Sequence, residues 1–325
     1  MKYVQFFSEA VADPTRLGGK GSNIVRLVKI GVNVPPGFIV SAESYAKFLE
    51  ESGQREQLAE LLSKSIHPPE VVNLSRSIRK LILESEFPVD MQNEIELAFD
   101  RIRRETGTSA SFAVRSSATI EDMNNFSFAG QGETYLNNTT FEDVLSSVRK
   151  CWASLFSLRA LSYFVHMERI GRKYSLSDVR MAVVVQKMID SQVSGVMFTA
   201  NVMNNNPDQI MINSTWGLGE AIANNSVIPD MFILQKGRFR ILKTLVGEKE
   251  RTSIRNPRDM GTIMIDTDLG LRSKCCLDEK QLRMLRDLGL QLERAFGSPQ
   301  DIEWAMENGT TYIIQSRPIT ALRST

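Results

Sequence analysis

The sequence feature that most constrains this chain is a run in its first half, FAVRSSATIEDMNNFSFAGQGETYLN, which covers residues 112–137. An apolar strand is expected at the start of the run, and it ends on the fixed positive charge of Arg115. A loop rich in Ser, Gly and Asn follows, and a second short strand is expected from Thr134. A strand end holds an arginine rigidly, and a loop of small residues lets backbone N–H groups close over phosphate oxygens. The run therefore predicts a polyanion-binding loop between two strands.

The composition is that of an ordinary globular protein, with 42% hydrophobic and 24% charged residues in a chain of 325. This length is enough for about two domains. The net charge of +1 provides no overall field that would attract nucleic acid or an anionic membrane surface, so neither partner is expected. Any phosphate binding must then come from a local cluster of charges.

The cysteines and histidines exclude several other kinds of site. The three cysteines include one adjacent pair, Cys275 and Cys276, and do not resemble a disulfide framework. The two histidines show neither the spacing of a zinc site nor the setting of a catalytic triad. The first residues lack the apolar run of a signal peptide, and no stretch of about 18 apolar residues occurs. We therefore expect a cytoplasmic protein with reduced thiols.

Hydrophobic periodicity predicts helices mainly in the first half and strands mainly in the second. Helices are expected at 19–31, at 41–51 after an N-cap at Ser41, and at 54–106, 141–171 and 278–296. Strands are expected at 34–40, 112–117, 180–188, 194–200, 209–215 and 231–245, the last as a hairpin. This distribution predicts an α+β protein of two lobes, with a hinge near residues 187–193.

A glycine-rich segment near the N-terminus, LGGKGSN, is a candidate anion site. Gly18, Gly19 and Gly21 immediately precede a helix, and a helix N-terminus attracts anions. Lys20 would add a point charge there. The segment is not a Walker A motif, and the alternative interpretation is a flexible loop with a solvated lysine. A second glycine-rich stretch, WGLGEAI, departs from the dinucleotide-binding pattern and is equally well explained as a structural turn.

The chain closes with a hairpin expected around Asn308 and Gly309. A two-residue turn would put Glu303 and Gln315 on opposite faces, because side chains alternate along a strand. A three-residue loop over 308–310 would instead pair Glu303 with Gln315. We expect the three-residue loop, since such loops with glycine are common.

The same loop would also pair Asp301 with Arg317 and so create one polar patch of four side chains. A carboxylate and an amide oxygen, from Glu303 and Gln315, suit a Mg²⁺ ion whose other ligands are phosphate and water oxygens. Arg317 beside them would neutralise charge on a transferring phosphoryl group. The alternative is an exposed polar face with an Asp301–Arg317 ion pair.

Seven motifs occur in an order that resembles the ATP-binding domain of the phosphoenolpyruvate synthase / pyruvate phosphate dikinase family, which includes rifampin phosphotransferase-like enzymes. The motifs span about residues 15–320 and are LGGKGSN, VPPGF, FAVRSSATIEDMNNFSFAGQGETYLN, VVVQKM, SGVMFTA, STWGLGEAI and DIEWAMENGTTYIIQSRPIT. The resemblance implies an ATP-grasp-like, two-lobed nucleotide-binding module with the nucleotide between the lobes. Residues 1–188 would form the N-terminal lobe and residues 189–325 the C-terminal lobe.

The resemblance implies binding roles for residues of the first lobe. Lys20 and Arg115 would contact the ATP phosphates and act in catalysis. Gly130 and Thr134 would belong to the loop that covers the phosphates. Gln186, at the end of a buried strand, would lie near the adenine.

It also implies roles for three residues of the second lobe. Glu303 and Gln315 would bind Mg²⁺ and, through it, the nucleotide. Arg317 would contact the transferring phosphates and act in catalysis. ATP and Mg²⁺ are therefore the expected cofactors.

The resemblance implies a reaction that needs a partner. The ATP domain of the complete enzymes passes the β-phosphoryl group of ATP, usually as a pyrophosphoryl unit, to a histidine on a mobile domain, and AMP results. That histidine then phosphorylates a small-molecule acceptor. Neither His67 nor His166 lies in a phosphohistidine context, so we expect a phosphohistidine-domain partner on a separate chain or in a removed portion. The segments TANV (199–202) and AIANNS (221–226) depart from the family's usual residues.

Two other functions remain open at this point. A stand-alone ATP-grasp ligase would activate a carboxylate as an acyl phosphate and release ADP. A non-catalytic nucleotide-binding subunit would bind ATP without turnover. The product, AMP or ADP, separates the first of these from a dikinase-type transferase.

Overall fold

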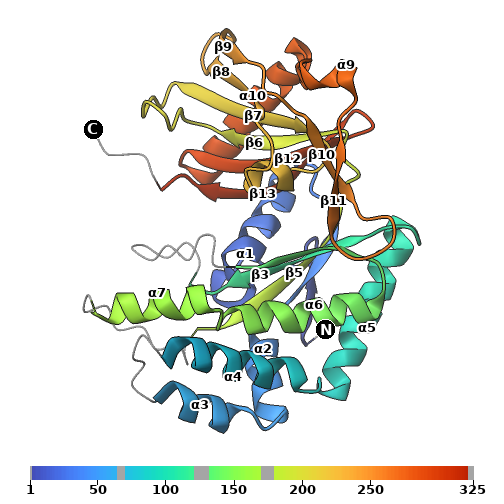
Figure 1. The fold of residues 1–325 in the computed structure, drawn as a ribbon, viewed down its shortest axis with the longest axis vertical. Helices are drawn as coiled ribbons and strands as arrows, with labels where there is room; N and C mark the ends of the chain where they lie inside the picture. The colour runs from blue at the N-terminus through green and yellow to red at the C-terminus, as the bar shows by residue number, and fades with distance from the viewer. Residues whose placement is uncertain (1, 64–69, 121–131, 170–178, 321–325) are drawn as a thin grey trace. The chain divides into compact units, whose positions relative to one another are not determined.

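The computed structural model describes residues 2–63, 70–120, 132–169 and 179–320 (Figure 1). It is a mixed α and β protein, which agrees with the α+β class predicted from the sequence. The chain divides into two compact units, Met1–Val25 with Pro36–Met188, and Arg26–Pro35 with Ile189–Thr325. Within the described residues, no helix is both long enough and apolar enough to cross a membrane.

The first unit is built on a five-stranded sheet in the order β1-β2-β5-β3-β4, in which every neighbouring pair is antiparallel. Its strands are β1 (Val4–Phe6), β2 (Gly37–Val40), β3 (Phe112–Ala118), β4 (Thr134–Asn138) and β5 (Met181–Lys187). All seven residues of β3 are buried, and so are the first six of β5. This burial agrees with the nearly continuous apolar run of β5, whereas β3 also buries Arg115 and two serines.

Besides part of α1, the described residues of the first unit form the helices α2 (Ala42–Glu51), α3 (Arg55–Ser63), α4 (Val71–Glu84), α5 (Val89–Thr106), α6 (Phe141–Ser154) and α7 (Leu158–Arg169). Helix α6 packs on β3, β4 and β5 (Figure 1). Its Trp152 is fully buried and stacks near Phe48 and Phe87, with ring centroids 4.8 and 5.4 Å apart. Ser41 caps α2 as predicted, and its hydroxyl accepts a hydrogen bond from the backbone of Ser44.

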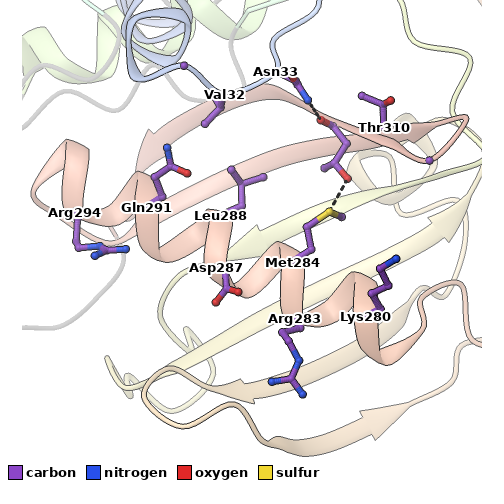
Figure 2. A pocket seen from close by; sticks show the side chains of 13 residues that line it. Val32, Asn33, Lys280, Arg283, Met284, Asp287, Leu288, Gln291, Arg294 and Thr310 are labelled. Carbon is purple, nitrogen blue, oxygen red and sulfur yellow. Dashed lines mark hydrogen bonds between the residues drawn. The ribbon is translucent and has the colours of Figure 1, made fainter.

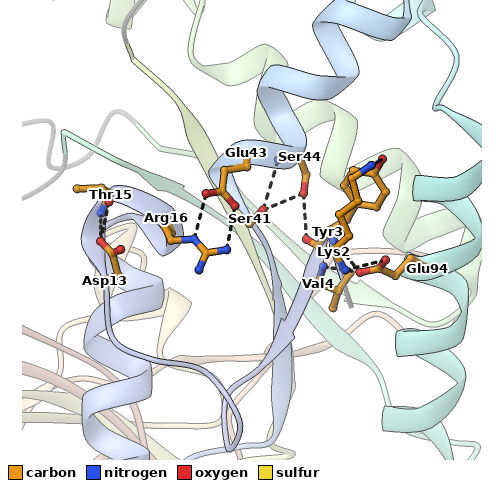
Figure 3. A network of polar contacts seen from close by, with 10 residues as sticks. All are labelled: Lys2, Tyr3, Val4, Asp13, Thr15, Arg16, Ser41, Glu43, Ser44 and Glu94. Atoms are coloured by element: carbon orange, nitrogen blue, oxygen red, sulfur yellow. Dashed lines mark hydrogen bonds and ion pairs between the residues drawn. The ribbon is translucent and has the colours of Figure 1, made fainter.

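The edge strand β1 is held by a carboxylate from α5 (Figure 3). Glu94 accepts hydrogen bonds from the backbone N–H groups of Lys2 at 3.0 Å, Tyr3 at 2.6 Å and Val4 at 2.9 Å. An edge strand exposes backbone donors that have no neighbouring strand. Glu94 satisfies the donor of Val4 in β1 and those of the two residues before it, and it fixes this segment to the first unit.

Helix α1 (Pro14–Ile30) contributes to both units. Its first part lies on the sheet face opposite to α6, where Gly21 approaches Ile39 of β2. Its last part supplies Leu27, which is fully buried in the core of the second unit. Residues 26–35 thus pack with the second unit although they precede residue 188.

The second unit is built on a six-stranded antiparallel sheet in the order β13-β12-β6-β7-β8-β9. Its strands are β6 (Val193–Phe198), β7 (Gln209–Trp216), β8 (Asp230–Gln235), β9 (Ile241–Leu245), β12 (Gln300–Glu307) and β13 (Thr310–Pro318). A separate hairpin is formed by β10 (Arg251–Arg255) and β11 (Thr262–Asp266). Two short helices are α8 (Glu220–Ala223) and α9 (Leu269–Arg272).

Helix α10 (Glu279–Phe296) covers one face of this sheet. Leu285 and Leu292 of the helix are fully buried with Ile302 and Trp304 of β12. The helix begins at a capping box on Asp278, and the left-handed Gly297, with φ of 75°, follows its last residue. Both ends of this helix agree with the sequence prediction.

The β12–β13 hairpin has the predicted cross-strand pairs but not the predicted loop. Glu303 lies opposite Gln315, as expected. However, Glu307 lies opposite Thr310, so the connection is a two-residue turn and the expected three-residue loop over 308–310 is wrong.

Two local features produce the observed register. Asn308 and Gly309 have φ values of 50° and 77°, the left-handed values that a tight type I′ hairpin turn requires. A β-bulge then lies further along, because Trp304 pairs with Ile313 while Glu303 pairs with Gln315. The extra residue on β13 changes the alternation of side chains, and it brings Gln315 back to the face of Glu303.

Candidate functional site

Three of the predicted site residues share one face of the first unit's sheet. Arg115 on β3 lies directly opposite Thr134 on β4 and Val184 on β5, and Gln186 is two residues further along β5. Opposed residues of antiparallel strands, and residues two apart on one strand, project from the same face. Arg115 and Gln186 are 7% and 1% exposed, whereas Thr134 is exposed. Arg115 lies in the middle of β3, which continues to Ala118, and not at the strand end expected from the sequence. The sheet therefore holds a buried arginine and a buried amide beside the exposed first residue of β4.

The glycine-rich segment lies within helix α1 instead of before it. The helix begins at Pro14 and breaks at Gly18, which has φ of 67° and ψ of 175°. Gly18 lies so close to β3 that an added Cβ would be 2.1 Å from the carbonyl oxygen of Ser117. Only glycine combines this backbone conformation with this approach. The expectation that the glycines precede the helix is corrected, although a new helical segment does begin after Gly18.

The turn before the break is tied to helix α2 (Figure 3). Asp13 accepts hydrogen bonds from the backbone and hydroxyl of Thr15, at 2.9 and 2.7 Å. Arg16 donates from Nε and Nη2 to the two carboxylate oxygens of Glu43, at 3.1 and 3.0 Å. A two-pronged pair of this kind fixes direction as well as distance. The start of α1 is thereby held on the N-terminal side of Gly18.

Lys20 lies beside the residues that precede β4. Its Nζ is 3.7 Å from the position that a Cβ on Gly132 would take. Ser116, next to Arg115, donates from its backbone N–H and its hydroxyl to the carbonyl oxygen of Glu133, both at 3.1 Å. The structure thus brings Lys20, the end of β3 and the start of β4 together within the first unit. Gly130, the remaining candidate of this loop, lies outside the described residues.

A thiol near Lys20 is not a nucleophile candidate. Cys151 of α6 is fully buried, and burial raises the pKa of its thiol well above the usual range. The nearby Glu133 carboxylate raises this pKa further, while the charge of Lys20 lowers it. A thiol with a raised pKa is unreactive, because the thiolate is the nucleophile. All three cysteines are free.

The second unit carries the other predicted group. Glu303 and Gln315 are directly opposed on β12 and β13, and Asp301 and Arg317 are opposed two residues further along the strands. The four side chains therefore share one face, opposite to the face that α10 covers. Arg317 donates to the Oδ2 atom of Asp301 from Nε at 2.9 Å and contacts the same oxygen from Nη2 at 2.8 Å. Burial raises the pKa of Asp301, and Arg317 partly offsets this.

The residues of this patch fit a magnesium ion by their chemistry. Directly opposed side chains have Cβ atoms about 4.5–5.5 Å apart, so the carboxylate of Glu303 and the amide oxygen of Gln315 can reach one ion. Mg²⁺ binds through one or two protein oxygens together with phosphate and water oxygens. Among the described residues, no cluster of three or more His, Cys, Asp or Glu side chains could hold a metal alone. A metal bound here would take its remaining ligands from phosphate and water oxygens.

A groove of about 880 Å³ lies elsewhere on the second unit (Figure 2). It is bordered by α10, by the loop Gly31–Asn33 and by the turn that follows Asn308. Figure 2 shows the charged side chains of Arg283, Asp287 and Arg294 along the helix. None of the described candidate residues lines this groove, so the candidate site is a separate part of the molecule.

Asp301, predicted from the sequence to pair with Arg317, orients that arginine. The structure also places at these sites one residue that the sequence pattern did not single out, Ser117, which hydrogen-bonds to α1 on either side of Gly18. The signal for Ser117 was its place two residues after Arg115, on the same face of a strand. Nothing in the local pattern indicated its partner.

The fold and these residues define a mixed α and β protein in which one unit carries two fixed cations and the other a carboxylate–amide–arginine patch. Comparison with known proteins identifies the family. The family described as pyruvate phosphate dikinase, AMP/ATP-binding domain, matches residues 14–325. The chain belongs to this family, which confirms the resemblance of the seven motifs. The family is thus described by its binding of adenine nucleotides.

Curated relatives agree with this assignment. The chain is 40% identical over 326 residues to a probable phosphoenolpyruvate synthase of Methanothermobacter thermautotrophicus, which covers 99% of the chain and 46% of that protein. It is 36% identical to the phosphoenolpyruvate synthase of Pyrococcus furiosus, over 99% of the chain and 44% of that protein. It is 38% identical to the rifampicin phosphotransferase of Bacillus subtilis, over 94% of the chain and 34% of that protein. The chain thus spans less than half the length of these relatives.

Proposed function

We propose that this chain is the ATP-binding component of a dikinase-type phosphotransferase. It binds Mg·ATP and transfers the β-phosphoryl group, as a pyrophosphoryl unit, to a histidine on a partner domain or protein. The imidazole nitrogen attacks the β-phosphorus, the bond from that phosphorus to the oxygen shared with the α-phosphate breaks, and AMP leaves with the bonding electron pair. Water then takes the terminal phosphoryl group from the pyrophosphohistidine, and inorganic phosphate is released. The remaining phosphohistidine passes its phosphoryl group to a small-molecule acceptor.

The observation that carries the proposal is the placement of two cations at β3. Arg115 is held in the strand, and Lys20 lies in the turn of α1 that Ser117 fastens to the same strand. Fixed positive charges stabilise a triphosphate without reorganising as charge develops. Thr134, the first residue of β4, opposes Arg115, and Gln186 lies further along β5 as the candidate for contact with the adenine.

The second unit supplies the residues that would hold the metal, together with the third cation. Glu303 and Gln315 would hold Mg²⁺, which would neutralise phosphate charge. Arg317 contacts the transferring phosphates, in an orientation set by Asp301. Positioning and electrostatic stabilisation account for most of the catalysis of phosphoryl transfer, so a histidine acceptor requires no further group on this chain.

The two units act as the lobes of an ATP-grasp-like module and serve one nucleotide. The N-terminal lobe corresponds to residues 1–188 and the C-terminal lobe to residues 189–325, with residues 26–35 packed on the latter. The family match supports this assignment, because it extends over nearly the whole chain. The greater length of the relatives supports a histidine-bearing partner.

The products of ATP turnover test the proposal. The chain is incubated with Mg·ATP alone, and then with the separately expressed remainder of the Methanothermobacter relative. ³¹P NMR should show AMP only when that partner is present, and AMP should disappear when the partner's histidines are replaced. Formation of ADP with a carboxylic acid as co-substrate would overturn the proposal in favour of a ligase, and failure to bind Mg·ATP would overturn both.

A further inference from the structure

A serine hydroxyl is inserted into the backbone hydrogen-bond ladder of α1. Ser117 on β3 is fully buried. Its Oγ donates to the carbonyl oxygen of Leu17 at 2.8 Å and accepts from the N–H of Gly21 at 3.0 Å. Leu17 and Gly21 are four residues apart, so an unbroken α-helix would bond them directly. The hydroxyl therefore bridges the two ends of a helical hydrogen bond that the break at Gly18 has opened.

The bridged turn is the one that carries Lys20. Side-chain insertion into the ladder is a recognised cause of a sharp helix kink. Here the kink is determined from both sides, because Gly18 approaches the backbone of Ser117 and the hydroxyl of Ser117 spans the opening. The direction of the turn is thus set by β3 instead of by α1 alone.

Ser117 also has a fixed relation to the second cation. Arg115 lies two residues before it on β3, so both side chains project from the same face, roughly 6.8 Å apart along the strand. One hydroxyl thereby connects the strand that holds Arg115 with the turn that holds Lys20. The separation of the two charges depends on that connection.

We propose that Ser117 is a positioning residue for the phosphate site, whose hydroxyl sets the place of Lys20 relative to Arg115. This rests on the proposed function, because it assumes that these two cations bind the phosphates of one nucleotide. Ser117 itself touches the backbone of α1 and has no catalytic role. Its loss should therefore weaken contacts to the outer phosphates and leave contacts to the nucleoside unchanged.

A second buried serine of the first unit provides the matched control. Ser75 of α4 is 5% exposed, and its hydroxyl donates to the carbonyl oxygen of Phe156 at 2.7 Å. Like Ser117, it ties a side chain to the backbone of a distant segment. It contacts neither α1 nor β3 through this bond, so Ser75→Ala reports the effect of losing a buried hydroxyl on stability alone.

The test compares the dissociation constants of ATP and AMP, measured by calorimetry with excess Mg²⁺ at equal folded fraction. Ser117→Ala should weaken ATP binding by about tenfold, within the range of coupling for residues in one network, with little change for AMP. Ser75→Ala should change neither constant. Lys20→Met should weaken ATP binding less in the Ser117→Ala background than in the wild type. If Ser117→Ala does not fold, Ser117→Cys keeps the volume, weakens both hydrogen bonds and should shift the constants in the same direction.

The possible outcomes separate this inference from the proposed function. Wild-type protein that fails to bind Mg·ATP would overturn the proposed function, and the inference with it. Wild-type binding together with a Ser117→Ala variant that behaves like Ser75→Ala would overturn the inference alone. The inference would also be overturned if Lys20→Met weakened ATP binding by the same factor in the wild type and in the Ser117→Ala background. Equal factors would mean that the two residues act independently.

Discussion

Arg317 contacts Asp301 through two guanidinium nitrogens, Nε at 2.9 Å and Nη2 at 2.8 Å from the same carboxylate oxygen. The pair joins β12 to β13 near the end of the hairpin that is farthest from the turn. Glu303 and Gln315 are the next opposed pair on the same face. The ion pair therefore both orients the arginine and holds together the strands that carry the proposed metal ligands.

Replacement of Arg317 should affect turnover more than binding. Arg317→Ala should lower the rate of AMP formation by about 10²–10³, the loss expected for one preorganised electrostatic donor. The dissociation constant of ATP should change much less, because the contact strengthens as charge develops on the transferring group. Single-turnover rates and calorimetry measure the two quantities. Arg294→Ala, in the groove on α10, is the control, and equal losses of rate and affinity in Arg317→Ala would contradict the role.

Asp301 should act through Arg317. Asp301→Asn keeps the size of the side chain and removes the charge that orients the guanidinium, so the rate should fall by less than in Arg317→Ala. In the Arg317→Ala background, Asp301→Asn should have little further effect, since residues of one network are not additive. The four rates of this cycle are measured with the partner present. Full additivity would show that Asp301 acts independently.

Glu303 should set the magnesium requirement. Glu303→Gln removes the only charged ligand of the proposed pair, so the Mg²⁺ concentration for half-maximal ATP binding should rise by at least about tenfold. Replacing even a hydrogen-bond partner of a metal ligand costs about that much affinity. Titration of Mg²⁺ at fixed ATP gives this value. Glu279→Gln, on the exposed first turn of α10, should leave it unchanged. An unchanged requirement in Glu303→Gln would place the metal elsewhere.

The hairpin shows what a sequence pattern can and cannot determine. The residue types of Glu303, Gln315 and Arg317 indicated which side chains belong together, and the structure pairs them as predicted. The predicted loop was wrong, because the register of a hairpin is the sum of its turn and of any bulge. The left-handed Asn308 and Gly309 form the shorter turn, and the bulge at Ile314 compensates for it. Alternation of side chains alone does not reveal a bulge.

The first unit shows a different limit. Arg115 and Lys20 were identified from charge and from neighbouring small residues, and the ends of α2 and α10 from their capping residues. The bridge from Ser117 to α1 joins residues 96 and 100 positions apart, a proximity that only the folded chain creates. Leu27 is a similar case. The apolar spacing in its helix predicts that it is buried, but not that it is buried in the core of the second unit.

The capping box at the start of α6 should make the stability of the first unit depend on pH. Thr140 accepts from the backbone N–H of Asp143 at 3.1 Å, and the Asp143 carboxylate accepts from the backbone of Thr140 at 3.0 Å and of Thr139 at 3.1 Å. Partial burial raises the pKa of Asp143, but these donors outweigh burial and hold it below the usual value of 3.8. The folded state therefore favours the carboxylate. Its stabilising effect is complete above the unfolded pKa and is lost as pH falls through the lower, folded pKa.

Asp143→Ala should thus lower the free energy of unfolding by about 1 kcal/mol at pH 7, the usual effect of losing a helix cap. The loss should shrink as pH falls below the ordinary range of an aspartate, because protonation removes the same interaction from the wild type. Urea unfolding of both proteins at several pH values between neutral pH and about pH 3 measures the difference in their free energies of unfolding. This range includes the ordinary pKa of an aspartate. Helix α6 packs on β3 and β4, which carry Arg115 and Thr134, so its capping box supports the strands of the proposed site. If the stability difference between the two proteins stays constant with pH, the Asp143 carboxylate does not contribute to that support.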